Sequence, residues 1–127
     1  MHDRTLYEYA VVRLVPRVER EEFINIGVLL YCRKQRYADI LFHVDVDRCS
    51  LLSPEIDFEQ ILGHLDSMKQ VCLGTKAGGA LAQLDQTERF RWLTAKRSTL
   101  IQCSSVHPGL CTDAFATHQE LFNKLVL

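Results

Sequence analysis

Three strand-like segments follow one another closely within residues 6–44, and this spacing limits the possible folds more than any other feature of the sequence. In LYEYAVVRLV (6–15) the side chains alternate between two faces, as in a β-strand, and Pro16 ends the segment. INIGVLLYC (24–32) is almost continuously apolar, which is typical of a central strand, and Gly27 within it indicates a bulge or a close backbone approach. YADILFHV (37–44) follows the basic turn RKQR. Connections this short predict antiparallel pairing.

Beyond residue 44 the pattern becomes mainly helical. The predicted elements are a short helix capped by Asp45 or Asp47 and ending at Leu52, a helix from Ser53-Pro54 to Gly74, a helix over 85–95, a strand over 98–103 and a helix over 113–126. The segment 85–95 combines a capping signal at Asp85 with a strand-like alternation around Trp92, and we predict a helix there.

The order of these elements predicts an α+β fold. We expect a small, mainly antiparallel sheet of about four strands with helices packed on one face. The chain has 127 residues, which is the usual size of one domain, and no linker divides it. The predicted organisation is therefore a single α+β domain over residues 1–127.

The charge of the chain is nearly balanced but unevenly distributed. The net charge is −1, which provides no overall attraction to nucleic acid or anionic lipid. Residues 1–36 carry a net +2, residues 37–88 a net −6 and residues 89–127 a net +3. Basic flanks around an acidic middle favour internal or partner electrostatics over a broad surface that follows a phosphate backbone.

The cysteines and the first residues bear on localisation. Five cysteines form an odd set without a CxxC pair, and Cys32, Cys72 and Cys103 lie in apolar stretches. This usage favours a reducing compartment over a disulfide framework. The charged start MHDRTLYEYA does not resemble a signal peptide, and no apolar run approaches the roughly 20 residues of a membrane span. We therefore expect a cytoplasmic protein without membrane association.

One motif suggests metal chemistry. His43, Asp45 and Asp47 would share a face if the strand continued, and an imidazole with two carboxylates could hold the divalent ion of a hydrolase or nuclease. The alternative is that the strand ends near Val44 and an aspartate caps the next helix. Cys103, His107 and Cys111 are spaced by four, but structural zinc usually has a tighter ligand pair and a fourth ligand, and Pro108-Gly109 prevents one helix from presenting the three. A Cys103–His107 nucleophilic pair needs a third group to orient the imidazole, and the sequence identifies none.

Basic residues suggest a second function. Arg33, Lys34 and Arg36 lie on the turn, and four further cations, at 89, 91, 96 and 97, surround Phe90 and Trp92. Arginine beside an aromatic ring can stack on a base or bind phosphate, so a nucleic-acid-binding module is an alternative. The competing interpretation is that these arginines pair internally and that Trp92 belongs to the core.

Polar residues at the strand ends mark the candidate binding site. One group flanks the fourth predicted strand and consists of Arg97, Ser98, Thr99, Gln102 and His107. A second group, Arg13, Glu22 and Asn25, brackets the apolar run of the second strand. We predict that a site, if present, combines the two groups, and this fails if they lie on opposite sides of the domain.

Three long segments carry a family resemblance. These are YEYAVVRLVPRVEREEFINIGVLLYCR, DVDRCSLLSPEIDFEQILGHLDSMKQVCLG and RFRWLTAKRSTLIQCSSVHPGLC, and together they resemble the bacterial family of unknown function called DUF3037. The resemblance covers almost the whole chain and implies neither an activity nor a cofactor. Family members are often encoded beside HipA-like serine/threonine kinases, which implies an accessory or partner role to such a kinase. The family-like positions include all the candidate binding residues: Arg13, Glu22, Asn25, Arg91, Arg97, Ser98, Thr99, Gln102 and His107.

The first functional hypothesis is therefore a non-catalytic protein-interaction or accessory module that uses no cofactor. It depends on an ordinary domain size and on the lack of GxSxG, HExxH, GxGxxG and phosphate-loop motifs. The alternatives remain a metal-dependent hydrolase or nuclease at His43, Asp45 and Asp47, and a nucleic-acid-binding module.

Overall fold

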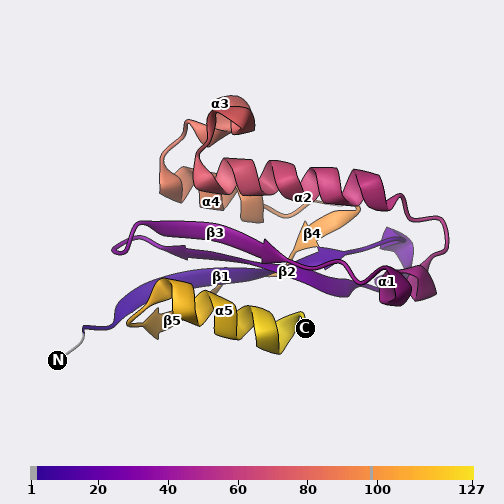
Figure 1. Ribbon diagram of the computed structural model, residues 1–127, viewed down its shortest axis with the longest axis horizontal. Helices are drawn as coiled ribbons and strands as arrows, with labels where there is room; N and C mark the ends of the chain where they lie inside the picture. The colour runs from indigo at the N-terminus through magenta and orange to yellow at the C-terminus, as the bar shows by residue number, and fades with distance from the viewer. Residues whose placement is uncertain (1–2, 98) are drawn as a thin grey trace.

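The centre of the molecule is a five-stranded antiparallel sheet, seen in a computed structural model that describes residues 3–97 and 99–127 (Figure 1). Strands β1 (Thr5–Leu14), β2 (Ile24–Cys32) and β3 (Tyr37–Phe42) form a meander in the order β3-β2-β1. On the other side of β1, β5 (His107–Cys111) pairs with its first half and β4 (Ile101–Cys103) with its last three residues. The predicted antiparallel sheet and α+β class are confirmed.

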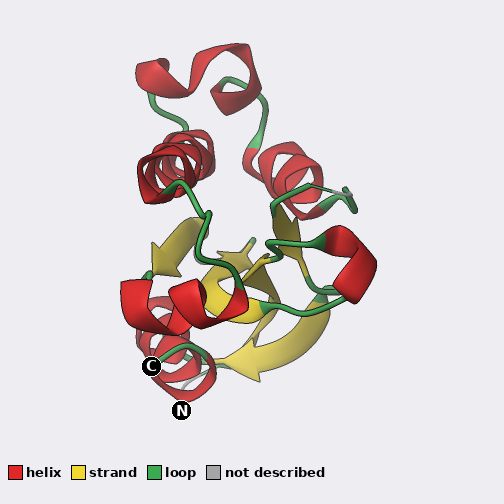
Figure 2. Cartoon of the chain, turned by 90° about the vertical axis from the view of Figure 1, so that its right-hand side faces the viewer, coloured by secondary structure: helices red, strands yellow, loops and turns green. Residues whose placement is uncertain are grey.

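Helices cover both faces of this sheet, whereas the sequence predicts cover on one face. Helices α2 (Phe58–Leu73) and α4 (Gln86–Thr94) lie side by side on one face, and α5 (Ala114–Leu125) lies on the other (Figure 2). The physical reason is the composition of β2. Its Leu29 and Tyr31 join the core beneath α2 and α4, while Leu30 and Cys32 pack with Ala114. A strand that is apolar on both faces needs cover on both.

Most of the predicted helices are present. The carboxylate of Asp45 caps α1 (Val46–Leu52) by accepting the Arg48 N–H at 3.2 Å. Helices α4 and α5 also begin after aspartate caps, and Gly74 ends α2 with a left-handed φ of 72°. The remaining short elements are η1 (Val18–Arg20), η2 (Lys76–Gly78) and α3 (Gly79–Ala82). Within the described ranges, no helix has the length and apolar character needed to span a membrane.

One predicted helix boundary is wrong, and one strand was missed. Helix α2 begins at Phe58 rather than at Ser53-Pro54, because the carboxylate of Asp57 accepts the Gln60 N–H at 3.1 Å and caps the helix there. The strand β5 is not predicted from the sequence, since it contains Pro108 and Gly109. Proline is tolerated at a sheet edge, where its missing N–H removes no ladder bond, and β5 lies at such an edge beside β1.

Gly27 lies where the sequence predicts a bulge or a close approach, and the structure contains both. The register between β1 and β2 shifts between Val12 and Arg13, opposite residues 25–27. A Cβ atom at position 27 would lie 2.8 Å from the backbone oxygen of Leu41 and 3.2 Å from the Cβ of Phe42. Only glycine therefore allows β3 to approach β2 this closely.

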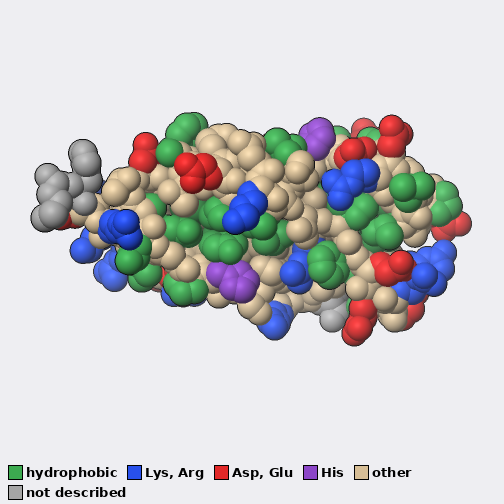
Figure 3. Space-filling view, turned by 90° about the horizontal axis from the view of Figure 1, so that it is seen from below, with side chains coloured by type: hydrophobic (Ala, Val, Ile, Leu, Met, Phe, Trp, Pro, Cys, Tyr) green, Lys and Arg blue, Asp and Glu red, His purple; other side chains and the backbone are tan. Residues whose placement is uncertain are grey.

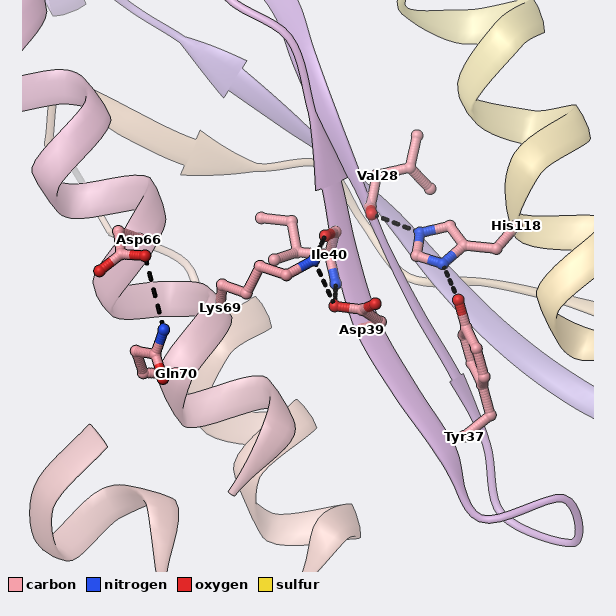
Figure 4. Close-up of polar contacts among 8 residues, drawn as sticks. All are labelled: Val28, Tyr37, Asp39, Ile40, Asp66, Lys69, Gln70 and His118. Atoms are coloured by element: carbon pink, nitrogen blue, oxygen red, sulfur yellow. Dashed lines mark hydrogen bonds and ion pairs between the residues drawn. The ribbon is translucent and has the colours of Figure 1, made fainter. Parts of the chain in front are cut away.

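The exposed edge of β3 is covered by side chains (Figure 4). The ammonium of Lys69, from α2, donates to the Ile40 carbonyl at 3.2 Å and forms an ion pair with Asp39 at 3.1 Å. The carboxylate of Asp39 also accepts the Ile40 N–H at 2.8 Å. Because both backbone groups of Ile40 are occupied, this edge is a poor template for an added strand.

The fully buried His118 joins α5 to the sheet (Figure 4). Its Nε2 lies 2.7 Å from the Val28 carbonyl oxygen, and its Nδ1 lies 2.6 Å from the Tyr37 hydroxyl. A carbonyl oxygen only accepts, so Nε2 carries the proton and Nδ1 accepts the Tyr37 O–H. The imidazole is thus neutral and satisfied on both nitrogens. Its burial lowers the pKa of His118 below the ordinary 6.5.

This depressed pKa predicts a loss of stability in mild acid. Above pH 6.5 the imidazole is neutral in both the folded and the unfolded chain, and its full contribution is present. As the pH falls from there toward the lower folded pKa, the unfolded chain binds a proton that the folded chain does not, so the free energy of unfolding decreases. Urea denaturation of the wild type and of His118→Gln between pH 5 and 8 measures this. We expect the wild type to have the steeper decrease below pH 6.5, and equal slopes would contradict the assignment.

Candidate functional site

Three of the predicted site residues lie side by side across the sheet. Arg13 on β1 pairs with Asn25 on β2 and with Gln102 on β4. The Asn25 amide donates to the Leu125 carbonyl at 3.1 Å, and the Arg13 guanidinium carbon lies 4.2 Å from the centre of the Phe23 ring. The structure therefore brings together three members of the two predicted groups in a row across the sheet, and Asn25 connects this row to the C-terminal end of α5.

The other members of these groups lie elsewhere. Glu22 forms an ion pair with the exposed Arg20, beyond the ends of the paired strands. His107 begins β5 and packs against Tyr9, with 5.3 Å between ring centres, four residues along β1 from Arg13. Ser98 lies outside the described residues. The predicted site is thus only partly assembled. Its members lie beside different parts of the long strand β1, or beyond the paired strands.

Arg97 and Thr99 line a groove between α2 and α4. The Arg97 guanidinium donates to the Trp92 carbonyl at 2.6 Å and lies 4.3 Å above the Trp92 ring. Two adjoining hollows of about 180 and 390 Å³ form the groove, and both are lined by His64, Met68 and Trp92. Trp92 is 42% exposed at the rim rather than buried in the core. Trp92 is therefore separated from the basic turn at residues 33–36. The nucleic-acid hypothesis had combined the two in one surface.

The candidate metal ligands do not form a cluster. His43 and Asp45 line a hollow of about 210 Å³ together with Asn25 and Arg48. The Asp45 carboxylate, however, accepts the Arg48 N–H as the cap of α1, and Asp47 lies in the first turn of that helix. Across residues 3–97 and 99–127, no group of three or more His, Cys, Asp or Glu side chains has the geometry of a metal site. The hydrogen bond supports the interpretation of Asp45 as a helix cap.

The thiols of Cys72 and Cys103 are poorly suited to nucleophilic chemistry. Burial raises the pKa of Cys72 to about 12 and that of Cys103 to about 11. The Cys103 thiol donates weakly to the Leu93 carbonyl, at 3.5 Å, instead of facing His107. A thiol with so high a pKa is almost entirely protonated at neutral pH, and the thiolate is the reactive form.

Two large hollows lie beside the β2–β3 turn. This turn is at the left of Figure 1. Two adjoining hollows of about 480 and 710 Å³ share Tyr31, Arg33, Lys34 and Thr87. We call their combined surface the basic basin. Its cations are Arg4, Arg33, Lys34, Arg36, Arg89 and Arg91, and its carboxylates are Glu8 and Asp85. Six cations against two carboxylates leave a strong local excess of positive charge on a chain whose net charge is −1.

The basic basin contrasts with the opposite end of the molecule. Residues 45–60 comprise α1, the connection that follows it and the first turn of α2. They contain five carboxylates and only one cation, Arg48. The view from below shows several Lys and Arg side chains along the lower left, with acidic side chains above them, and acidic and basic side chains mixed at the right end (Figure 3). The fold thus gathers cations from separate segments of the chain around the basic basin.

Two contacts in the basic basin tie α4 to the sheet. The Arg91 guanidinium binds the Glu8 carboxylate through two hydrogen bonds, of 2.8 and 3.2 Å. The Gln86 amide donates to the Arg36 carbonyl at 3.0 Å, so the first turn of α4 also holds the β2–β3 turn. Arg91 is the one candidate binding residue in the basic basin. It lies apart from the row formed by Arg13, Asn25 and Gln102.

Sequence reasoning missed the apolar part of this surface. Leu6 and Leu110 are cross-strand partners on β1 and β5, and they are 56% and 60% exposed within the first hollow. Leu110 belongs to the strand that Pro108 and Gly109 conceal, so its pairing with Leu6 is not visible in the sequence. The one available signal was the position of Leu6 in an alternating strand with a polar neighbour on each side.

Comparison with known proteins identifies the family. No curated protein and no solved structure matches the chain. A family model described as "Protein of unknown function (DUF3037)" matches residues 9–126, and this range includes β2, β3, all the helices and most of the basic basin. The match agrees with the resemblance carried by the three long sequence segments. The chain therefore belongs to the DUF3037 family.

Proposed function

We propose that this protein is a non-catalytic interaction module that binds a protein partner through the basic basin. The observation that carries the proposal is an open, highly charged hollow whose cations are largely unengaged. Among the described residues, Arg4, Arg33, Lys34 and Arg36 have no ion-pair partner, although they gather around one surface. Unpaired charges of one sign around an exposed leucine pair favour recognition of a complementary surface.

The candidate catalytic groups support binding over chemistry. The Asp45 carboxylate caps a helix, and the raised pKa values of Cys72 and Cys103 keep their thiols protonated. A hydrolase or nuclease at His43, Asp45 and Asp47 would require these side chains to leave their present arrangement. No contact in the described parts of the chain favours that alternative.

The protected sheet edges indicate how a partner would bind. On β3, Asp39 and Lys69 occupy the outward backbone groups of Ile40. On the opposite edge, Pro108 in β5 lacks an N–H. Because β3 and β5 resist strand addition, docking of side chains onto a surface is the favoured mode. We further propose that this takes place in the cytoplasm. A HipA-like kinase is one partner that the proposal admits.

Affinity capture from the native host with matched variants tests the proposal. The Arg33→Ser, Lys34→Ser double variant removes two exposed cations from the basic basin, and Arg17→Ser, Lys124→Ser removes two exposed cations elsewhere. Both double variants lower the net charge by two. We expect the wild type and the control to retain a protein partner in near-stoichiometric amounts, and the basin variant to retain about tenfold less, as loss of interfacial charges predicts.

Equal retention by all three forms would contradict the basic basin as the binding surface. Recovery of nucleic acid alone, released by salt, would instead support the nucleic-acid-binding alternative. Circular dichroism of the three forms controls for folding. The substituted side chains of Arg33 and Lys34 are exposed, so no change in the spectrum is expected.

A further inference from the structure

We infer that the occupant of the basic basin is an acidic segment of a partner protein that carries aliphatic side chains. The inference rests on the proposed function and adds the chemistry of the partner. Three features of the basic basin support it: its unpaired cations, its leucine pair and, among the described residues that line it, the lack of an accessible aromatic ring.

The cations divide into two groups. Arg91 is engaged by Glu8, and Arg89 donates to the Leu84 carbonyl at 2.6 Å, so these two shape the floor. Arg33, Lys34 and Arg36 lie exposed on the turn above it. Unpaired and hydrated, they can bind carboxylates without first breaking an internal ion pair.

The leucine pair adds an apolar anchor point. Cross-strand partners have Cβ atoms about 5 Å apart, so Leu6 and Leu110 form one continuous patch. Both line the same hollow as Arg4, Arg33 and Lys34. An aliphatic side chain of the partner would remove this patch from water while neighbouring carboxylates bind the cations. A ligand that is only an anion would leave the leucines exposed.

The aromatic residues argue against nucleic acid as the occupant. Single strands bind by stacking bases on exposed aromatic rings. The Tyr31 ring in the basic basin is 4% exposed and packs on Phe90, and its hydroxyl is hydrogen-bonded to Thr87. Trp92 lines the separate groove between α2 and α4. Among the described residues that line it, the basic basin therefore provides charge without a stacking platform.

The floor of the basic basin is also fixed before binding. Gln86 holds the Arg36 carbonyl, Thr87 holds the Tyr31 hydroxyl, and Arg91 holds Glu8. These contacts join α4 to β1, to β2 and to the β2–β3 turn. A surface with a fixed floor loses little conformational freedom when a flexible segment binds, which favours measurable affinity for a short peptide.

Fluorescence anisotropy with three labelled probes tests this inference. The probes are a Glu/Asp-rich peptide with two central leucines, the same peptide with serines at those positions, and a single-stranded oligonucleotide of equal formal charge. Each is titrated with the wild type, with Leu110→Ser, with the Arg33→Ser, Lys34→Ser variant and with the Arg17→Ser, Lys124→Ser control.

We expect the leucine peptide to bind tightest. Leu110→Ser should weaken only that peptide, by about fivefold to tenfold, as loss of one apolar contact predicts.

The basin double variant should weaken both peptides by about tenfold, with the control unchanged, and added salt should weaken both. Tighter binding of the oligonucleotide would overturn the inference in favour of a nucleic-acid surface. Equal affinity for the leucine and serine peptides would overturn the apolar part. If no peptide binds but host capture still depends on Arg33 and Lys34, the partner presents a folded surface. That outcome rejects the inference and leaves the proposed function standing. If no peptide binds and host capture does not depend on Arg33 and Lys34, the inference and the proposed function are both rejected.

Discussion

Replacing His118 with alanine is expected to lower the free energy of unfolding by about 4 kcal/mol, in the range found for large buried side chains. The substitution removes a fully buried ring between α5 and the sheet. It also leaves the Tyr37 hydroxyl and the Val28 carbonyl without the partners that the imidazole provides at 2.6 and 2.7 Å. Urea denaturation at pH 7.5 followed by circular dichroism measures the change.

Tyr37→Phe provides the matched control for this loss. It removes one hydrogen bond to the same imidazole and leaves the ring in place, so we expect a decrease of about 1–2 kcal/mol. If His118→Ala destabilised the protein no more than Tyr37→Phe, the imidazole would not be the main connection between α5 and the sheet. The order of the two effects therefore tests how α5 is held.

Gly27→Ala is expected to destabilise the protein by about 2–3 kcal/mol, the upper part of the range for overpacked sites. The added methyl group would lie 2.8 Å from the Leu41 backbone oxygen, and this oxygen belongs to the neighbouring strand and cannot rotate away. The strands β2 and β3 would have to separate at the bulge, beside the Arg13–Asn25 pair. The melting temperature and the urea midpoint should both decrease.

Gly63→Ala is the control for this substitution. Gly63 lies on the exposed side of α2, and outside its chain neighbours and the backbone of its own helix an added Cβ would have no atom within 4 Å. Alanine is favoured over glycine inside a helix, so we expect an increase in stability of about 0.5–1 kcal/mol. Equal effects of the two substitutions would contradict the close approach at Gly27.

Local signals predicted most of the secondary structure. The aspartate caps at 45, 85 and 113 lie where the sequence places them, because a cap depends on a few neighbouring residues. The start of α2 was misplaced for the same local reason. Ser53-Pro54 and Asp57 are both acceptable caps, and packing of Ile61 and Leu65 against the sheet is consistent with the later start.

The candidate site was less predictable. Arg13, Asn25 and Gln102 lie side by side because the ends of adjacent strands meet, and their role as a site stays a prediction. The basic basin joins a turn at residues 33–36, a helix at 86–94 and the strand β5 at 107–111. The distances along the chain between these parts carry no information on their contact in space, and β5 itself was hidden by its proline and glycine.

The sequence by itself determined the strand meander, the helix caps, the need for glycine at position 27 and the class of the fold, since each follows from backbone geometry or from the period of apolar residues. Only the tertiary structure decided that helices cover both faces of the sheet, that Leu6 meets Leu110 and that the cations of three segments form one surface. These outcomes depend on how a long strand, β1, is shared between β4 and β5. That choice is made by the packing of the whole core, which no local pattern contains.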